Sequence, residues 1–365
     1  MGVKLDSIIS RRKLTFEELK GKIIAVDAPN IIMGLLNFSH KNPSFNSSTD
    51  LIMDRTQRAI SHLYGLLYRI KFYYSKDILP IFCFDGRVHP LKRKITKNQL
   101  NDFRFAQKRY RNAINSNNKE LARQIALSKE YFWPNLMKES KDLLHALGVP
   151  VVESPASAES QCAHLVKKGI AQFSNSQDFD SLLFGCPYLI QNLSKSRRRK
   201  VHGRWTYNRI DPLLVDLQQT LVELQIDQFQ LVELALMLET DYFEGIKGIG
   251  PKTALKLVRR YKRIENIISA QKYEYDFSGL DHKLISEFRK LFLLPEVVNS
   301  LDHLCWNPPN KSRILTLLCK DHHLNRERVE KHRNQLNDKF YECLQYFQYD
   351  LNRPKSVQKT LDMVL

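Results

Sequence analysis

Long hydrophobic runs are missing from this chain of 365 residues. No stretch approaches the roughly 18 apolar residues that are needed to span a bilayer. The first residues, Met1-Gly-Val-Lys-Leu-Asp, lack the apolar core of a signal peptide, and Asp6 stands where a myristoylation motif has Ser or Thr. These absences argue against a membrane anchor, and we expect an intracellular protein.

Cysteine is scarce and forms no pattern. No two cysteines stand in a Cys-x-x-Cys pair. This argues against a structural zinc site or a disulfide framework and fits a reducing compartment. Cys319, His322, His323 and His332 lie in a charged stretch that we expect to be helical, and we do not expect them to bind zinc.

Negative charge is in deficit. The chain has 57 Lys and Arg against 39 Asp and Glu, a net charge of +18 and a pI near 9.5. Such a positive field points to a polyanionic partner, and without a membrane segment nucleic acid is the better candidate.

Six of the acids accompany short apolar runs: Asp27, Asp85, Glu159, Asp178, Asp180 and Asp241. Runs such as Lys22-Ile-Ile-Ala-Val-Asp27 predict buried strands, and α/β sheets bind ligands beyond the carboxyl ends of their strands. A single Asp there is most often a helix cap or turn residue. Six such positions favour one common site, and gathered carboxylates need divalent metal or basic partners to stay ionised. The pattern therefore predicts a Mg²⁺ site.

The order of the runs predicts an α/β fold, with a central, mostly parallel sheet flanked by helices. Strands are expected to end at Asp27 and Asp85, with a helix near 56–74 between them, and further strands are expected near 149–152 and 169–176. Beyond residue 176 we expect helices that alternate with loops. In the second basic run, Ser194-Lys-Ser-Arg-Arg-Arg-Lys200, we expect a loop or strand edge close to phosphate.

A basic segment follows the second predicted strand. It begins Leu91-Lys-Arg-Lys-Ile-Thr-Lys97 and continues to about residue 135 with further cations and interleaved aromatics. The polar break Asn115-Ser-Asn-Asn118 predicts a turn between two helices. Charge runs are usually solvated helix faces, but the one-sided excess here favours a cap that contacts phosphates.

A glycine-rich string, Gly245-Ile-Lys-Gly-Ile-Gly-Pro-Lys-Thr-Ala254, comes soon after Asp241. Glycines let backbone N–H groups approach an anion, and Pro251 is suited to the first turn of a helix. The positive end of that helix, with Lys252 and Lys256, could bind phosphate. The string is similar to a helix-hairpin-helix DNA clamp.

Together these segments resemble the flap endonucleases of the XPG superfamily, in their archaeal and eukaryotic branch, from residue 1 to about 350. The resemblance rests on Met1-Gly-Val, Ala25-Val-Asp-Ala28, Ser61-His-Leu-Tyr-Gly-Leu-Leu-Tyr-Arg69, Phe82-Cys-Phe-Asp-Gly86, Ala158-Glu-Ser-Gln-Cys-Ala163, Asp178-Phe-Asp180, Phe184-Gly185 and Asp241 through Ala254.

The resemblance implies a PIN/XPG-like nuclease domain over residues 1–350. Its expected parts are an N-terminal nuclease part (1–90), a helical arch (91–135), an internal nuclease part with the clamp (136–260, clamp 241–260) and a helical C-terminal part (261–350). A flexible tail (351–365) would follow.

The implied activity is a structure-specific cut at the base of a DNA 5′ flap, with 5′–3′ exonuclease action, in replication and repair. Two Mg²⁺ ions are implied, with Mn²⁺ as a substitute. Asp85 and Glu159 would hold the first and Asp178, Asp180 and Asp241 the second, with Asp27 acting through water. Lys92 would stabilise charge on the scissile phosphate, so that Lys92 and Asp180 are the expected catalytic residues. The implied DNA contacts are Arg69, Lys92, Arg93, Lys97, Gly248, Gly250, Lys252 and Lys256.

Three departures from the family pattern stand at the reactive end of the site. Ser157 replaces a carboxylate, Gln99 an arch arginine and Met33 a base-stacking tyrosine. They keep open an alternative, a catalytically weakened or inactive module that binds branched DNA.

The resemblance also implies two partners, branched DNA with a 5′ flap and a sliding clamp (PCNA). Gln358, Leu361, Val364 and Leu365 form a degenerate clamp-binding motif in which aliphatics replace the family's aromatics. We expect a monomer without a membrane partner, in the cytoplasm or nucleoid of an archaeon or the nucleus of a eukaryote.

Overall fold

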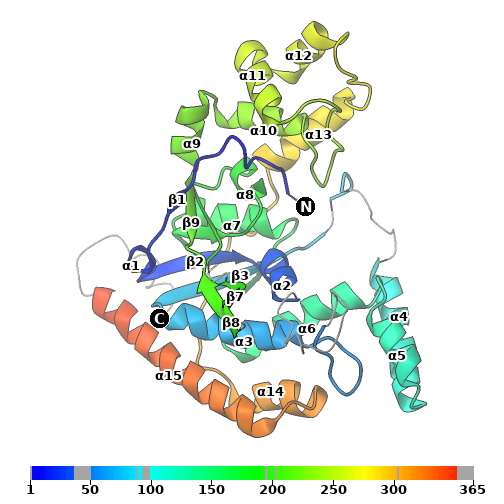
Figure 1. Ribbon diagram of the computed structural model, residues 1–365, viewed down its shortest axis with the longest axis vertical. Helices are drawn as coiled ribbons and strands as arrows, with labels where there is room; N and C mark the ends of the chain where they lie inside the picture. The colour runs from blue at the N-terminus through cyan, green and yellow to red at the C-terminus, as the bar shows by residue number, and fades with distance from the viewer. Residues whose placement is uncertain are drawn as a thin grey trace. The chain divides into compact units, whose positions relative to one another are not determined.

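The computed structural model describes residues 2–36, 51–87, 89–92, 99–193, 196–201, 204–301 and 304–351 (Figure 1). The chain divides into two compact units that interleave in sequence. Unit 1 comprises Met1–Asp27, Cys83–Lys94 and Val152–Leu301, and unit 2 comprises Ala28–Phe82, Ile95–Val151 and Asp302–Leu365. The domain boundaries predicted above stay predictions. Among the described residues, no helix is both long and apolar enough to cross a membrane.

The predicted α/β sheet is confirmed, and it is mixed. Its seven strands run in the order β1-β9-β6-β5-β2-β3-β4. Their bounds are Arg12–Lys13 (β1), Lys22–Asp27 (β2), Ile78–Phe84 (β3), Val151–Glu153 (β4), Phe173–Asn175 (β5), Tyr188–Gln191 (β6) and Leu213–Asp216 (β9). β5 pairs in parallel with β2 and β6, whereas β9 is antiparallel to β6 and β1.

The strands that carry the predicted acids form because their residues are apolar throughout. Ile23 through Val26 of β2 and all seven residues of β3 are buried. Continuous apolar runs of this kind are typical of central strands that are covered on both faces. In unit 1, α7 (Ala158–Lys167) packs against β2 and β5 and against α8 (Asp180–Leu183).

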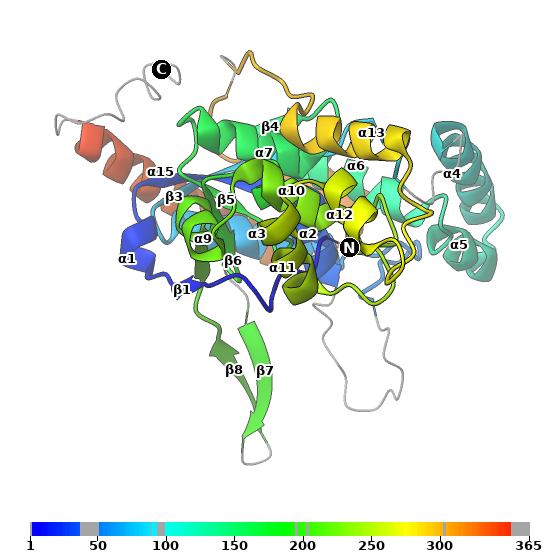
Figure 2. The same cartoon turned by 90° about the horizontal axis from the view of Figure 1, so that it is seen from above.

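The expectation of helices that alternate with loops beyond residue 176 is wrong, although the basic run at 194–200, expected as a loop or strand edge, does contain a strand. Four strands follow in the part of the chain that the structure describes: β6, β9 and the two strands of a ribbon, β7 (Ser196–Val201) and β8 (Arg204–Arg209). β6 and β9 are only four residues long, and the ribbon is too polar to give an apolar alternation. Pairing of Gln191 with Leu213 is followed along the chain by pairing of Ser196 with Arg209. The ribbon therefore extends the β6–β9 pair beyond the sheet (Figure 2).

The remaining described helices of unit 1 are α1 (Phe16–Leu19), α9 (Leu217–Leu224), α10 (Gln228–Leu236), α11 (Pro251–Tyr261), α12 (Ile264–Gln271) and α13 (His282–Leu293). A charged cluster joins three of them. Arg289 on α13 lies 2.7 Å from both Glu233 on α10 and Glu265 on α12. Glu233 also accepts the N–H of Ile264 at 2.7 Å, which satisfies a free donor at the start of α12. This cluster joins α10, which precedes the glycine string in the sequence, to α12 and α13, which follow it.

Unit 2 contains α2 (Ala28–Leu36), α3 (Ser61–Tyr74), α4 (Gln99–Asn115), α5 (Lys119–Ala126), α6 (Phe132–Ala146), α14 (Lys311–Leu315), the π-helix η1 (Thr316–Asp321) and α15 (Arg326–Leu351). The predicted pair of helices in the basic segment is confirmed as α4 and α5. Asn118 caps α5 by accepting the N–H of Leu121 at 3.0 Å. Two of the aromatics interleaved in the basic segment, Tyr110 and Tyr131, are buried in the core of this hairpin.

A second buried charged cluster lies wholly within unit 2. His322 Nδ1 is 2.8 Å from Asp54 Oδ2, and His322 Nε2 is 3.3 Å from Glu139 Oε1. Arg58 pairs with both carboxylates at 3.2 Å, and His62 lies 3.3 Å from Glu139. Burial opposes the charge on His322, but hydrogen bonds to Asp54 and Glu139 outweigh it and raise the pKa of the imidazole. Sequence reasoning assigned no role to His322, because its partners lie far away in the chain.

Candidate active site

Asp27 is the last residue of β2, and the neighbouring strand fixes its surroundings. Val26 pairs with Asn175 of β5, so that Ser176 comes next to Asp27. The Ser176 hydroxyl donates to Asp27 Oδ2 at 2.8 Å. The carboxyl ends of two parallel strands thus bring Asp27 to the loop that carries Asp178.

Asp178 lies between β5 and α8 and Asp180 is the first residue of α8, and both lie beside Gly2 and Val3. The N–H of Asp178 donates to Ser176 Oγ at 3.2 Å, and the N–H of Val3 donates to Asp180 Oδ1 at 2.7 Å. A Cβ added to Gly2 would stand 2.6 Å from the Cβ of Asp178, a distance that real contacts do not show. The N-terminal segment is therefore part of the site. In the sequence, Met1-Gly-Val served only as a mark of resemblance.

Asp85 and Glu159 come together at the start of α7. Asp85 follows β3, and its Oδ1 accepts the N–H of Ala158 at 2.8 Å. Ser157 is the N-cap of α7, and its hydroxyl accepts the N–H of Glu159 at 3.1 Å. Ser157, identified in the sequence only as a missing carboxylate, thus has a capping role. A serine directly before a helical Ala-Glu is a recognisable signal for it.

The acids affect one another electrostatically. Burial, and then the charges of Asp180 and Asp27 with those of Asp178 and Asp85, raise the pKa of Glu159 well above its ordinary value. Burial, with Asp178 and Asp241 as further causes, raises the pKa of Asp180 to about 6. All six predicted acids therefore belong to one electrostatic cluster within unit 1.

Lys92 is a cation at this cluster. Its Nζ lies 3.3 Å from Oδ2 of Asp241, in the loop after α10. Burial opposes the lysine charge, but Asp85, Asp241 and Glu159 outweigh it and raise the pKa of Lys92. The pKa of Asp241 is lowered. Burial alone would raise it, and the positive charge of Lys92 is among the causes that outweigh burial. Lys92 thus lies beside Asp241, and its contact with the scissile phosphate stays a prediction.

The residues fit a divalent metal. Oε1 of Glu159 is buried and accepts no hydrogen bond. A buried carboxylate oxygen among like charges is costly unless a cation satisfies it. Among the described residues, no three His, Cys, Asp or Glu side chains form a ready-made ion cage. An all-oxygen donor set suits Mg²⁺.

The glycine string forms the predicted turn after α10 and the first residues of the predicted helix, α11. Gly245 has φ +77°, and an added Cβ would lie 2.6 Å from the N of Glu239. Gly248 has φ +89°, whereas Gly250 has an ordinary φ of −97° and open space where a Cβ would stand. Lys252 and Lys256 are exposed one turn apart on α11. The string therefore presents two cations beside the N-terminus of a helix.

The other predicted residues are only partly placed. Arg69 is half-buried on α3 in unit 2, and Met33 is 52% exposed on α2 in the same unit. Gln99 begins α4. Outside the described residues lie Arg93, Lys97, Gln358, Leu361, Val364 and Leu365, and their roles stay predictions.

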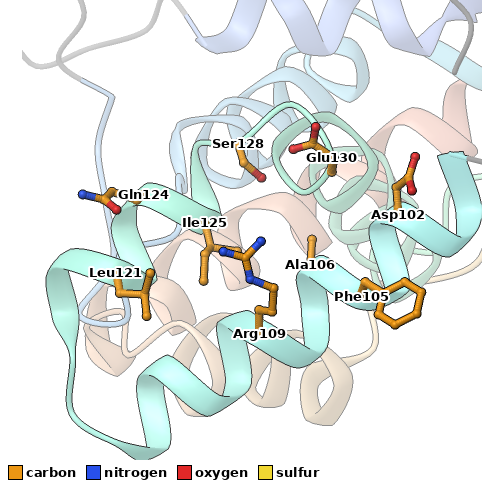
Figure 3. Close-up of a pocket in the computed structure, with 9 residues that line it drawn as sticks. All are labelled: Asp102, Phe105, Ala106, Arg109, Leu121, Gln124, Ile125, Ser128 and Glu130. Atoms are coloured by element: carbon orange, nitrogen blue, oxygen red, sulfur yellow. The ribbon is translucent and has the colours of Figure 1, made fainter.

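An open pocket of about 310 Å³ lies on the surface of the hairpin of α4 and α5. Arg109 reaches from α4 toward Ile125 of α5 (Figure 3). Phe105, on the same helix, is 70% exposed at the rim. The complete lining is Asp102, Phe105, Ala106, Arg109, Leu121, Gln124, Ile125, Ser128 and Glu130. None of the six acids contributes to it, so this pocket is separate from the acidic cluster.

Comparison with known proteins agrees with this arrangement. Residues 1–104 match the XPG N-terminal domain and residues 148–241 match the XPG I-region. The chain is thus a protein of the XPG class. The catalytic core of Rad2 in a complex with a DNA substrate, at 22% identity and a TM-score of 0.61 over 89% of this chain and 95% of that one, is similar in fold.

Closer relatives define the family. Flap endonuclease 1 of Pyrococcus horikoshii is 38% identical over 331 residues, 90% of this chain and 92% of that protein. Flap endonuclease 1 of Aeropyrum pernix is 34% identical over 94% of this chain and 97% of its own length. The solved flap endonuclease-1 of Methanococcus jannaschii has a TM-score of 0.70 at 26% identity, over 93% of this chain and 99% of that one. This chain belongs to the flap endonuclease 1 family, as the resemblance predicted.

Proposed function

We propose that this chain is a Mg²⁺-dependent nuclease that hydrolyses the phosphodiester bond at the base of a DNA 5′ flap. The observation that carries the proposal is the acidic cluster around Glu159, whose buried Oε1 accepts no hydrogen bond. Membership of the flap endonuclease 1 family supports the same reaction. A module that only bound DNA would gain nothing from a cluster of six acids whose excess of negative charge repels phosphate.

The acids would hold two ions in two sets: Asp85 and Glu159 for one, and Asp178, Asp180 and Asp241 for the other, with Asp27 acting through water. When bound, two Mg²⁺ ions stabilise negative charge and activate water for phosphodiester hydrolysis. Mn²⁺, which takes similar oxygen ligands, would substitute.

The chain's own groups have separate tasks in this proposal. Ser176 and the N–H of Val3 orient Asp27 and Asp180 by the hydrogen bonds described above. The N–H of Ala158 orients Asp85. Lys92 would stabilise charge that develops on the transferring phosphate, a role that is typically worth a few kcal/mol.

Two other surfaces would bind the DNA. Lys252 and Lys256, beside the turn at Gly248 and Gly250, are suited to the phosphates of a duplex. The hairpin of α4 and α5 would contact the single-stranded flap, because its cations outnumber its acids: Arg104, Lys108, Arg109, Arg111, Lys119 and Arg123 against Asp102 and Glu120.

A cleavage assay on a labelled 5′-flap duplex, with and without Mg²⁺, tests the proposal. We expect one main cut near the base of the flap, which EDTA abolishes and Mn²⁺ restores. Asp180→Asn should bind the flap and fail to cut it. Flap binding by the wild type with no cleavage at any Mg²⁺ or Mn²⁺ concentration would identify the inactive DNA-binding module instead.

We further propose that a sliding clamp docks on the tail through Gln358, Leu361, Val364 and Leu365. A short helical turn could place the three aliphatics in an apolar pocket. Deletion of residues 355–365 should remove clamp-stimulated cutting and leave unstimulated cutting intact. Stimulation of the truncated chain by its cognate clamp would disprove tail docking.

A monomer would suffice for this reaction, because all six acids come from one chain. Sedimentation at micromolar concentration tests this, and a stable dimer would contradict it. The proposed substrate is chromosomal DNA, so the place of action would be the cytoplasm or nucleoid of an archaeon or the nucleus of a eukaryote.

A further inference from the structure

The turn that carries Lys92 is attached to the loop that carries Asp241 at two points. The first is the ion pair of Lys92 with Asp241 at 3.3 Å. The second is a ring contact, because His89 meets Tyr242 nearly edge-on with centroids 6.1 Å apart. Tyr242 directly follows Asp241, so both contacts join the same two segments of unit 1.

His89 also closes the turn itself. The N–H of Lys92 donates to the carbonyl oxygen of His89 at 2.9 Å, and the N–H of Leu91 donates to His89 Nδ1 at 3.3 Å. Pro90 stands at the second position, where its fixed φ favours a turn. The His89 side chain therefore stabilises the turn through Nδ1 and packs against Tyr242 through its ring.

Tyr242 is a fixed partner for that ring. It packs edge-on against Phe288 and Phe292 of α13, with centroids 6.5 and 5.8 Å apart. Burial raises the pKa of its phenol, and Asp180 and Glu159 raise it further, as expected for a ring beside the acidic cluster. His89 thus connects the Lys92 turn to the helical core of unit 1 next to the acids.

Lysine has a long, flexible side chain whose ordering costs conformational entropy. A fixed turn limits where its amine can reach, and misplacement of a catalytic group by about 1 Å can cost on the order of a hundredfold in rate. We propose that His89 is a positioning residue, which holds the turn against Tyr242 and keeps the Lys92 amine at the acids before DNA arrives. This inference rests on the proposed nuclease function.

Single-turnover cleavage of a 5′ flap at saturating enzyme separates this role from binding. His89→Ala should slow cleavage by about tenfold to a hundredfold, with flap affinity and the thermal unfolding midpoint little changed. His89→Asn keeps an acceptor for the turn and His89→Phe keeps a ring for Tyr242, so both should cut at intermediate rates. Wild-type rates in all three variants would refute the proposal.

A double-mutant cycle tests whether His89 acts through Lys92. If it does, His89→Ala combined with Lys92→Ala should be as slow as Lys92→Ala alone, because the two residues form one unit. Losses that multiply would show that His89 acts independently of Lys92, and would overturn the inference.

A readout without activity distinguishes failure of this inference from failure of the proposed function. In metal-free protein, an amine-acylating reagent should modify Lys92 faster in His89→Ala than in the wild type, as followed by peptide mass spectrometry. Exposed Lys252 serves as the internal control and should react equally in both. Equal rates at Lys92 would refute positioning by His89 whether or not the wild type cuts DNA.

Discussion

Ser157 combines two properties that matter in opposite directions. It contributes no charge where the family pattern has a carboxylate, and it caps α7 through the N–H of Glu159. We expect Ser157→Glu to lower the Mg²⁺ concentration for half-maximal cleavage, because it adds a negative charge to the site. The same change should reduce the free energy of unfolding by about 1 kcal/mol through loss of the cap.

Ser157→Ala is the matched control for this prediction. It removes the cap without adding charge, so thermal unfolding should shift as in Ser157→Glu while the Mg²⁺ requirement stays as in the wild type. A Mg²⁺ requirement that Ser157→Glu leaves unchanged would show that position 157 lies outside the metal shell.

Asp180 gives the metal-free protein a defined pH dependence. Its folded pKa, about 6, lies above the ordinary value of 3.8. Because the folded protein holds this proton more tightly than the unfolded chain does, protonation of Asp180 adds to the free energy of unfolding. This contribution is complete below pH 3.8 and is lost as the pH rises through about 6. Above that pH a cation can replace the proton, so Mg²⁺ should raise the unfolding temperature clearly at about pH 7.5 and little at about pH 5.

Thermal unfolding in Mg²⁺ and in EDTA, at both pH values, measures this effect. Asp180→Asn should show a much smaller Mg²⁺ effect at the higher pH, because the titrating carboxyl is gone. A Mg²⁺ effect equal at both pH values would argue against proton and metal competing for these acids.

The six acids could be predicted because each stands at a position that short-range patterns mark, such as the end of an apolar run. The contact of Val3 with Asp180 could not be, because it joins residues 177 positions apart. The close approach of Gly2 to Asp178 has the same origin. Such contacts depend on how the whole unit folds, which no local spacing records.

Among the elements, two glycines of the glycine string have different roles: Gly245 is required for the fold, and Gly250 is proposed to approach DNA. Gly245 has a positive φ and no room for a Cβ, whereas Gly250 has an ordinary φ and open space. We expect Gly245→Ala to lower the unfolding temperature. Gly250→Ala should leave it unchanged and weaken duplex binding alike for all sequences, because a methyl group would hold a phosphate away from the helix N-terminus.

Binding measured as a function of salt checks the neighbouring lysines. Lys252→Ala should flatten the salt dependence by about one phosphate contact. Duplex affinity of Gly250→Ala equal to that of the wild type would mean that the string does not approach the DNA backbone.

Elements were predictable where their pattern was strong. β2 and β3 have continuous apolar cores, and α4 and α5 are separated by a polar turn with a capping Asn118. β6 and β9 are four residues long, too short for a period to be distinguished. Their strand conformation comes from pairing with each other and, for β6, with β5.

In the molecule as a whole, the stability of unit 2 depends on a buried charged cluster of its own, which is separate from the acidic cluster of unit 1. Glu139 is buried beside Arg58, His62 and His322. Glu139→Gln should lower the free energy of unfolding by about 3–5 kcal/mol, because it removes one of the two buried carboxylates that balance Arg58 and His322. Chemical denaturation measures this loss.

Lys138→Ala is the control for that experiment. It removes the exposed pair with Asp142 on the same helix, which should cost no more than about 1 kcal/mol. Equal losses in the two variants would contradict a special role for the buried cluster.

The interleaving of the two units has a consequence for biosynthesis. Unit 1 draws its last segment, Val152–Leu301, from well after the first segments of unit 2, and its acids are supplied between Asp27 and Asp241. A nascent chain that has only just emerged from the ribosome past Asp180 still lacks Asp241, the partner of Lys92. Folding of either unit must therefore wait for late segments, and a truncated translation product carries only part of the acidic set. A chain whose synthesis stops before Asp241 would therefore lack the complete acidic set.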